Sequence, residues 1–455
     1  MAYHRSFERI LSGRRVGIFA ACVGVLAACG GRPAEVSPNE IPELEARLAD
    51  NPEDGDVLLR YAAALFSAGR CDTARVVAAR GAQAKPRSAL APLVLGQCFE
   101  QTNDFDQAVD VYGAFLTSFP EERGADAVRA RQMLALRARA TLRAQNALAQ
   151  EAQLGTQGGD PRTLAVLPID IAGDSIYQPL GRGLAQIFTA DLALLQQFTL
   201  VERIQVQALI DEIRLAETGR VDQATAARVG RMLQAGRMVQ GAASIPDEDD
   251  VQLNMAVIDN QGQVASPSAR QGRLRDLMRM EKETVIELSA QLGYQLSEAE
   301  RRAILENGTQ NLAAFLAYSN GLAAEDIGDF SAAATYYQQA VQSDPGFRQA
   351  REQFRANAAA PAVENATAGQ ITTVSTETVQ APDVFGESVA DAVSTSVADV
   401  AATTSEALSA TTTGSTSATT QQATKTTTST PNPTTVTKGV STTITGVVRV
   451  IFRLP

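Results

Sequence analysis

Hydrophobic residues are spaced differently in successive parts of the chain, and each spacing predicts a different kind of structure. From 41 to 154, apolar and small residues recur every three or four positions, which predicts amphipathic helices. From 163 to 300, short apolar runs alternate with helical patterns, which predicts an α/β domain. A Gly-containing linker, 155–162, separates the two, and 301–360 returns to the helical pattern. The expected fold class is therefore an α/β domain combined with all-α helical repeats.

Prolines mark a repeat within the first helical region. Pro52, Pro86 and Pro120 are each 34 residues apart, which is the period of the tetratricopeptide helix–turn–helix repeat. In the units 55–88 and 89–122, small and aromatic residues occupy the slots where paired helices approach and pack. These residues are Ala62, Gly69, Ala74, Gly96, Phe99, Ala108 and Tyr112. The tryptophan slot of the motif is empty in both units, but the period is kept.

A third unit follows much later in the sequence, at 314–347, and matches the repeat best. Its matching residues are Gly321, Gly328, Phe330, Ala333, Tyr337, Ala340 and Pro345. Because at least three units are usually needed for a continuous repeat core, this unit should pack on the α/β domain before it or on the first pair. A helix predicted at 125–154 would cap the first pair.

The α/β region is predicted as an alternation of strands and helices. The expected strands cover 163–170, 198–202, 237–243 and 251–259. The expected helices cover 180–196, 206–216, 223–233 and 274–292. A turn at Asn260-Gln261-Gly262 leads from the last strand to a continuation near Val264.

The composition changes again near the C-terminus. Residues 361–443 become rich in Thr and Ser and carry few large apolar groups, so this segment cannot bury enough surface to offset chain entropy and is expected to be disordered. Residues 444–455 differ, because Arg449 and Arg453 alternate with apolar residues. These are Val448, Val450, Phe452 and Leu454. The pattern predicts one β-strand, and because a lone strand is unstable we expect it to dock on a sheet edge.

The N-terminus has the pattern of a secretory signal. Arg14 and Arg15 precede a short apolar run, 16–28, that ends in the small residues Ala27 and Ala28. The run is too short for a transmembrane helix, which needs roughly 20 apolar residues. Residues 1–28 are therefore expected to be a signal peptide, and cleavage at an ordinary secretory site is the alternative to lipoprotein processing.

Cys29 directly follows that predicted cleavage site, an arrangement that resembles the lipobox of bacterial lipoproteins. The resemblance implies that Cys29 carries a diacylglycerol thioether and an N-acyl chain. Each buried methylene contributes about 0.8 kcal/mol, so several chains would anchor the protein stably. Gly30 stands where an Asp would favour inner-membrane retention, which implies the outer membrane and its periplasmic face. Residues 29–40 would be the tether.

Composition excludes several classes of function. The formal net charge of −11 leaves no basic surface for nucleic acid. The only histidine, His4, lies in the predicted signal, so the mature chain cannot use Ser-His or Cys-His catalysis or a His-based metal centre. P-loop, G-x-S-x-G and S-x-x-K motifs are absent from the sequence. We therefore expect no catalytic residue, no metal and no cofactor.

Cys71 and Cys98 would remain beside Cys29 after signal removal, because Cys22 leaves with the signal. An oxidising compartment allows them to form a disulfide. Cys71 is expected to start the second helix of one unit and Cys98 to lie in the first helix of the next, at similar heights. Such a placement suits the roughly 4.4–6.8 Å between α-carbons that a disulfide needs. The alternative is two buried free thiols.

Three other motifs have a functional and a plain structural interpretation. Gly181-Arg182-Gly183 could belong to a phosphate loop, but a tight helix start is favoured. The acidic run 247–250 could bind calcium, but a solvated turn is favoured. Asp170 and Asp174 could form an acid/base pair, but no other polar cluster supports them and a loop cap is favoured.

Five motifs follow one another through the α/β region. They are L-A-V-L-P-I-D at 164–170, L-G-R-G-L-A at 180–185, F-T-L-V-E-R at 198–203, Q-A-L-I-D-E at 207–212 and A-A-R-V-G-R-M-L-Q-A-G-R-M-V-Q-G at 226–241. By these motifs, residues 163–300 resemble the CsgG family, named for the curli secretion lipoprotein of the outer membrane. The half at 163–233 also resembles the N-terminal domain of TolB and the peptidoglycan-synthase activator LpoB. The resemblance implies a domain that works through contacts with other proteins.

Together these observations suggest a non-enzymatic outer-membrane lipoprotein that acts in the periplasm as an adaptor or assembly factor for envelope or secretion machinery. Its partners would be the membrane, through Cys29, and proteins docked by the repeats, with homo-oligomers formed by the CsgG-like domain. The alternative is a ring-forming secretion channel component. Membrane hairpins need strands of about 9–11 alternating residues, whereas 245–272 is short and contains Pro246 and Pro267. A carboxylate-based hydrolase, the third option, lacks any motif.

Overall fold

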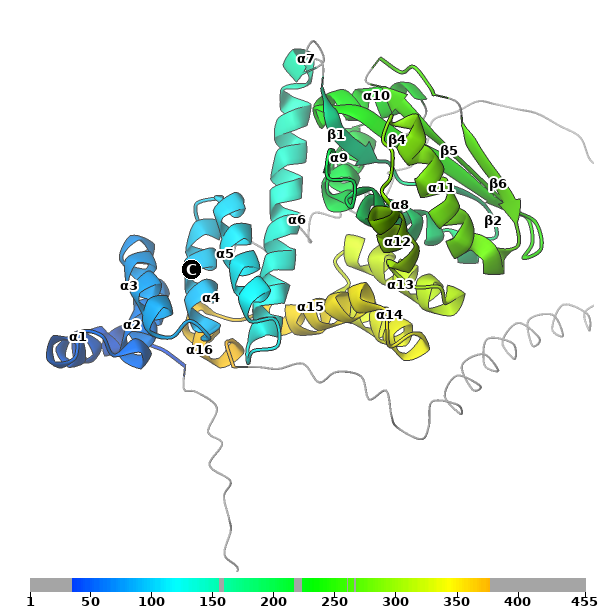
Figure 1. Ribbon diagram of the computed structural model, residues 1–455. Helices are drawn as coiled ribbons and strands as arrows, with labels where there is room; N and C mark the ends of the chain where they lie inside the picture. The colour runs from blue at the N-terminus through cyan, green and yellow to red at the C-terminus, as the bar shows by residue number, and fades with distance from the viewer. Residues whose placement is uncertain (1–34, 155–158, 217–222, 260, 266, 377–455) are drawn as a thin grey trace, which may run out of the picture.

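The computed structural model describes residues 35–154, 159–216, 223–259, 261–265 and 267–376. The predicted signal peptide, Cys29, most of the predicted disordered segment and the predicted terminal strand 444–455 lie outside the described residues. Within them, a lobe of helical repeats and an α/β lobe lie side by side, and the long helix α6 stands between them (Figure 1).

The first lobe consists of consecutive antiparallel helices. They are η1 (Pro38–Glu40), α1 (Ile41–Asp50), α2 (Gly55–Ser67), α3 (Cys71–Ala84), α4 (Leu90–Glu100), α5 (Phe105–Ser118), α6 (Ala125–Ala149) and α7 (Glu151–Leu154). Aspartates start two of them, because the Asp54 and Asp104 side chains accept hydrogen bonds from backbone amides in the first turns of α2 and α5. The pairs α2/α3 and α4/α5 are the two units that the 34-residue period predicts.

The core of the second unit depends on a glycine beneath a tyrosine. A Cβ at Gly96 would lie 2.1 Å from the Tyr112 ring, so only glycine lets α4 and α5 approach this closely. The fully buried Tyr112 hydroxyl donates to Glu100 at 2.6 Å. The same contacts recur in the distant third unit, formed by Gly321, Glu325 and Tyr337. The two units are therefore built alike.

The second lobe contains a mixed sheet. Its strands are β1 (Asp160–Val166), β2 (Asp170–Gly173), β3 (Thr199–Leu200), β4 (Ala235–Ile245), β5 (Val251–Asp259) and β6 (Ser268–Gly272). The strand order is β3-β1-β4-β5-β6, and β2 also pairs with β4. The pairs β1/β3, β1/β4 and β2/β4 are parallel, whereas β4/β5 and β5/β6 are antiparallel.

The strand predicted at 163–170 is two strands in the structure. β1 and β2 pair with successive parts of β4, and the break falls at Pro168, which has no N–H to donate to the ladder. The sequence pattern also did not predict β6, a short edge strand in which only Ser268 is buried. The strand predicted at 251–259 is confirmed as β5.

Helices cover both faces of the sheet. They are α8 (Leu180–Leu192), α9 (Arg203–Ala216), α10 (Gln223–Met232) and α11 (Leu277–Gln291), the last preceded by η3 (Leu274–Asp276). Leu164 and Val166 of β1 belong to the core with α8 and α11, whereas Ala165 belongs to the core with α9 and α10. This alternation is the period-2 pattern of a strand buried on both faces.

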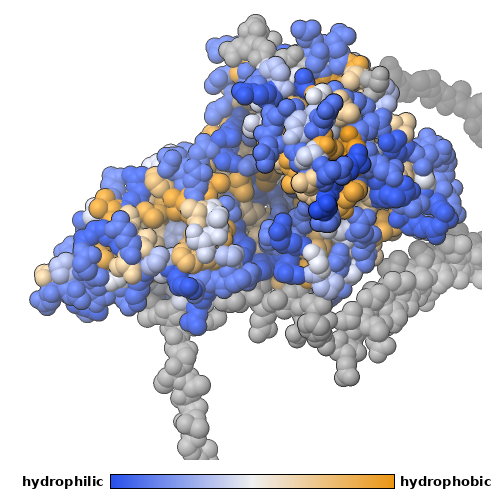
Figure 2. Space-filling model, in the orientation of Figure 1, coloured by the Kyte–Doolittle hydropathy of each residue, from blue (hydrophilic) through white to orange (hydrophobic). Residues whose placement is uncertain are grey.

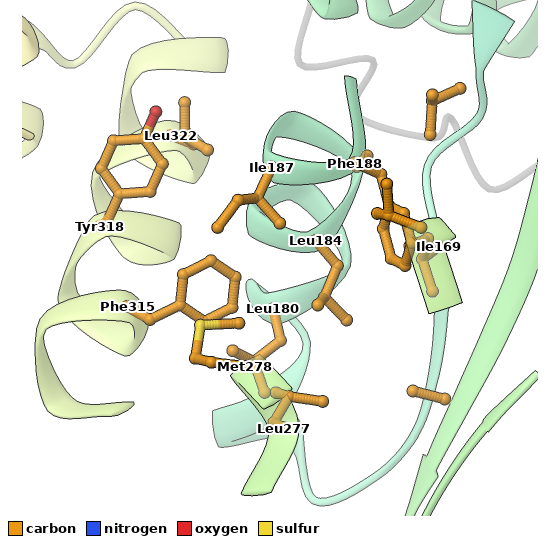
Figure 3. Packing of buried hydrophobic residues seen from close by; sticks show 14 of the residues in the cluster. Ile169, Leu180, Leu184, Ile187, Phe188, Leu277, Met278, Phe315, Tyr318 and Leu322 are labelled. Carbon is orange, nitrogen blue, oxygen red and sulfur yellow. The ribbon is translucent and has the colours of Figure 1, made fainter. Parts of the chain in front are cut away.

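The last described helices connect the two lobes. They are α12 (Glu298–Glu306), α13 (Leu312–Asp326), α14 (Phe330–Ser343) and α15 (Arg348–Glu364). Phe315 and Tyr318 of α13 lie on the side of α8 that carries Ile187 (Figure 3), and α13 contacts α8 while α15 contacts α6. The third unit therefore packs on the α/β domain through α13, as one of the two expected arrangements has it, while α15, the helix after this unit, packs on α6.

The disorder predicted from 361 onward is wrong for residues 361–376. Helix α15 continues to Glu364, and η4 (Ala368–Gln370) and α16 (Ile371–Val374) follow. The composition of this stretch is Thr-rich, but Ile371 and Val374 are buried in the repeat core, where they gain the apolar contacts that a free tail would lack. The end of the predicted tether is also ordered, because the Val36 amide donates to the Gly369 carbonyl at 2.8 Å.

Candidate functional site at the junction of the lobes

Four helices meet where the repeats join the α/β domain. α9 packs along α6, and α8 packs against α13. A Cβ at Gly183 in α8 would lie 2.0 Å from the Ser319 hydroxyl of α13, so this glycine permits the close approach of the two helices. The junction is therefore a packed interface rather than a loose hinge.

A buried ion pair joins the α/β lobe to α13 of the third repeat unit at the centre of this interface. Arg203, the first residue of α9, donates through Nη1 and Nη2 to the two carboxylate oxygens of Asp326 at 3.0 and 2.9 Å. Arg182 of α8 donates through Nε to the same carboxylate at 2.9 Å. The Arg203 and Asp326 side chains are only 6% and 5% exposed. We refer to Arg182, Arg203 and Asp326 as the junction clamp.

The charges in the clamp compensate one another despite burial. Burial alone would raise the pKa of Asp326, but the Arg203 charge and its hydrogen bonds, with Arg182 and Arg137, hold that pKa below its usual value. Burial would lower the pKa of Arg203, and the Asp326 carboxylate raises it overall. Both groups are therefore ionised, and the bidentate geometry is the strong form of this pairing.

A second, more exposed set of ion pairs lies beside the clamp. Arg139 of α6 bonds Glu202 at 2.6 Å and Asp106 at 3.2 Å. Arg143, one helical turn further, bonds Asp106 at 2.6 Å. Glu202 and Arg203 are consecutive residues. Glu202 binds α6, which follows the first two repeat units, and Arg203 binds α13 of the third unit.

A groove of about 300 Å³ opens next to these contacts, between α6 and α9. Its apolar wall is formed by Phe105, Ala138, Leu142, Ile204 and Ala208. Its polar rim includes Gln145, Gln207, Asp211 and Glu212. In the same region, Figure 2 shows hydrophobic residues at the surface of the repeat lobe beside the hollow between the lobes. The groove has room for a few side chains.

Comparison with known proteins now identifies the parts of the chain. Residues 168–258 match the family described as curli production assembly/transport component CsgG, and residues 93–122 match a tetratricopeptide repeat. The chain carries a CsgG-family domain and tetratricopeptide repeats. These two kinds of domain indicate a role in protein interaction or assembly.

The other comparisons are less informative. No curated protein gives a significant match. Among solved structures, the structure of Naa15/Naa10 bound to HypK-THB contains a chain that is 14% identical, with a TM-score of 0.18. That match covers 73% of this chain and 60% of the other chain.

The CsgG-family match contains most of the junction clamp. Arg182 lies in the L-G-R-G-L-A motif and Arg203 ends the F-T-L-V-E-R motif, both within the matched residues. Asp326 lies outside the match, in the third repeat unit. The motifs of the CsgG-family domain are therefore used here to hold the repeats.

A second buried charged cluster lies inside the CsgG-family domain. Lys282 of α11 bonds Asp191 of α8 at 2.5 Å, and Asn307 donates to the same carboxylate at 2.6 Å. Gln349 of α15 donates to Asn307 at 3.0 Å, which extends the chain of bonds to the helix after the third repeat unit.

Glu281 lies beside this cluster and has weaker partners. One of its oxygens is 3.3 Å from the Lys282 Nζ, but neither oxygen makes a hydrogen bond within the described part of the chain. Burial, reinforced by the charge of Asp191, raises the pKa of Glu281 well above its ordinary value. The raised pKa extends the pH range over which the neutral, protonated form of Glu281 is favoured.

The structure places the two predicted disulfide cysteines together. Cys71 at the start of α3 and Cys98 in α4 are disulfide-bonded, with their α-carbons 5.3 Å apart. Cys29 lies outside the described residues, so its predicted lipidation stays a prediction. The bond links the two repeat units that the 34-residue period defines.

The motifs with two interpretations have structural roles. The Asp174 side chain accepts from the Ile176 amide and caps η2 (Ser175–Tyr177). Asp247 accepts from the amides of Asp249 and Asp250 in the turn between β4 and β5. Over the described ranges, no group of three His, Cys, Asp or Glu side chains is placed to hold a metal ion. No helix in the same ranges is long and apolar enough to cross a membrane.

Sequence reasoning missed the junction clamp. Arg182 and Arg203 stand in the motifs that carry the family resemblance, and that position is the one signal in the sequence that points to them. Asp326 follows Glu325 at the end of a repeat helix and looks like an ordinary exposed acid. Its partner lies 123 residues away, and only the fold brings the two together.

Proposed function

We propose that this protein is a non-enzymatic lipoprotein of the outer membrane that acts in the periplasm as an adaptor or assembly factor for envelope or secretion machinery. Cys29 would carry the lipid anchor. The repeats and the CsgG-family domain would each contact other proteins. The proposal assigns no catalytic residue and no cofactor.

The junction clamp is the observation that carries this proposal. It joins two domains of protein-interaction type through a buried bidentate ion pair, so that a partner bound to one domain is held at a fixed place relative to the other. An adaptor needs such a fixed relation between its binding surfaces. A chain whose domains moved freely would only raise the local concentration of its partners.

The position of the first described residues fits the proposed anchor. Cys29 precedes Val36 by seven residues, which span at most about 25 Å when fully extended. Val36 is buried in the core of the first repeats. A lipid on Cys29 would therefore hold the repeat lobe next to the membrane, with the CsgG-family domain at the other end of the molecule (Figure 1).

Membrane fractionation of the full-length protein tests the anchor. The wild-type protein should enter the membrane fraction and show the mass of a processed, acylated N-terminus. Cys29→Ala should be released into the soluble fraction or remain unprocessed and without acyl chains. An acylated Cys29→Ala protein, or a wild-type protein without lipid, contradicts the proposal.

The mass of the detergent-extracted protein, measured by light scattering, separates the adaptor from the channel component. A monomer or dimer supports the adaptor. A closed ring of many subunits overturns it in favour of a secretion channel component, and particle images of the same sample would show the ring directly.

A further inference from the structure

The groove between α6 and α9 is walled by apolar side chains from both helices. Ala138 and Leu142 lie four residues apart on α6. Ile204 and Ala208 lie four residues apart on α9, so each pair occupies one face of its helix. All four residues are half-buried. An apolar segment that entered the groove would remove these side chains from water, which is favourable.

The rim of the groove is acidic on the α9 side. Glu212 accepts a hydrogen bond from the Gln145 side-chain amide at 3.2 Å. Asp211 accepts from the Gln207 side-chain amide at 2.8 Å. Both donors are neutral, so these two bonds do not cancel the charges of the carboxylates. Arg137, the cation among the lining residues, donates to a backbone carbonyl of α13, and the two arginines of α6 described above bind carboxylates of their own. The groove therefore suits a segment that combines apolar side chains with positive charge.

A later part of this chain has that combination. Residues 407–455 contain no Asp or Glu but carry four cations, which are Lys425, Lys438, Arg449 and Arg453. The chain as a whole, in contrast, has a net charge of −11. Within 447–454 the two arginines alternate with large apolar residues. Because an arginine stem can lie along apolar surface while its head stays in water, such a segment can present both kinds of group to the groove.

The segment can reach the groove from the last described residues. Gly124 is the N-cap of α6, and a Cβ there would lie 1.9 Å from the Ser375 carbonyl oxygen, so residue 375 lies at the start of α6. The groove residues 138–145 lie about 20–30 Å further along the same helix, at 1.5 Å per residue. About 70 residues separate Thr376 from Val447, and an unstructured chain of that length would span about 45–50 Å on average.

We propose that the groove between α6 and α9 is a docking site for residues 447–454 of the same chain. The apolar side of the alternating pattern enters the groove, with Phe452 between Val450 and Leu454, and the two arginines reach the acidic rim. A tethered segment has an effective concentration in the millimolar range, so a weak contact is enough to fill the groove. A partner that uses this hollow has to displace the segment. The inference requires neither the lipid anchor nor the adaptor role.

Photocrosslinking of the full-length chain tests the proposal. Phe452 is replaced by the photoreactive aromatic residue p-benzoylphenylalanine, and the crosslinked peptides are identified by mass spectrometry after irradiation. Crosslinks should fall within 138–145 of α6 or 204–212 of α9. Mixing isotope-labelled with unlabelled chains shows that they form within one chain. The same photoreactive residue at Thr420, outside the apolar segment, is the matched control and should not produce these crosslinks.

Substitutions in the groove separate the apolar contact from the charge. Leu142→Asp should lower the yield of these crosslinks at least about tenfold, because it places a charge on the apolar wall. Glu212→Arg should lower the yield about threefold, as expected for one exposed charge pair. Glu306→Arg changes the net charge by the same amount at an exposed position of α12 and should leave the yield unchanged. If Leu142→Asp changes the circular dichroism, the comparison of Glu212→Arg with Glu306→Arg decides the result.

Four results overturn the proposal. Crosslinks to β3 or β6 would show that the segment docks on a sheet edge instead. Crosslinks formed only between labelled and unlabelled chains would assign the groove to a second copy. Equal losses in Glu212→Arg and Glu306→Arg would mean that the net charge, rather than the groove, attracts the segment. An absence of crosslinks to α6 and α9 from residue 452 would show that the groove does not hold this segment.

Discussion

Removing one partner of the junction clamp should destabilise the whole molecule, and the two partners should not be equivalent. Breaking a buried ion pair by deleting one member costs about 3–5 kcal/mol, because the remaining charge stays buried without its partner. Arg203→Met leaves Asp326 with the Arg182 bond at 2.9 Å, so its cost should be near the lower end, about 3 kcal/mol.

Asp326→Asn should cost more, about 4–5 kcal/mol, because it removes the carboxylate that binds both Arg203 and Arg182. Arg203 then loses its bidentate partner while it stays buried, and the charges of Arg182 and Arg137 remain beside residue 326. The double variant Arg203→Met with Asp326→Leu removes both charges and should lose less than the sum of the two single losses.

Urea unfolding of the full chain, followed by far-ultraviolet circular dichroism, measures these costs. The matched control is Arg279→Met, which breaks a bond of 2.7 Å to Glu283 on the surface, where solvent screens the charges and an ion pair contributes little to stability. If Arg203→Met costs no more than Arg279→Met, the clamp does not hold the lobes together.

Acidification gives an independent readout of the same group. The folded-state pKa of Asp326 lies below the ordinary value of 3.8, so the ionised group contributes stability above that value and loses it as the pH falls through the folded pKa. Asp326→Asn should lack this part of the acid-induced loss. An unchanged profile in the variant would contradict the role of Asp326 as a buried, paired carboxylate.

Three further predictions concern other parts of the structure. Replacing Cys71 and Cys98 by Ala should cost about 3 kcal/mol in urea unfolding, because the bond closes a loop with a sequence separation of 27, and a reducing agent should then have no further effect. Glu281→Gln should flatten the decline in stability as the pH rises above 4.5, because the raised pKa of Glu281 in the folded state makes the native protein hold a proton that the unfolded chain has lost. Each unit of pKa shift is worth about 1.4 kcal/mol. A decline as steep as that of the wild type would contradict this prediction. Gly96→Ala should lower stability by about 1–3 kcal/mol because its Cβ would overlap a buried tyrosine ring, whereas Gly113→Ala, whose Cβ meets only a flexible glutamine at 3.1 Å, should be neutral or slightly stabilising in thermal unfolding.

The sequence predicted those elements whose stability is local or periodic. The 34-residue period predicted the paired helices, and alternation predicted β5, because each pattern reflects one buried face. It did not predict β6, since a strand with the sequence Ser268-Ala269-Arg270-Gln271-Gly272 has little apolar alternation and forms through its pairing with β5. Helix α16 was missed for a similar reason, because its burial is decided by α2 and α4, which lie more than 270 residues earlier.

The candidate site was less predictable than the fold because it depends on contacts between distant residues. The two arginines of the clamp were visible in motifs, but a motif does not reveal which carboxylate an arginine reaches. A buried Asp at the end of a repeat helix has the same local sequence as an exposed one. The difference lies in α8 and α9, which remove Asp326 from water and supply the charges that make its burial tolerable.

The two ion pairs at consecutive residues predict different failures. Glu202 binds Arg139 of α6, and Arg203 binds Asp326 of α13. The Glu202 side chain is 48% exposed, whereas those of Arg203 and Asp326 are 6% and 5% exposed, so loss of Arg203 should disturb the seat of α13 on the α/β lobe far more than loss of Glu202. A partner that needs a fixed relation between the repeats and the CsgG-family domain should therefore be lost with Arg203→Met and retained with Glu202→Gln.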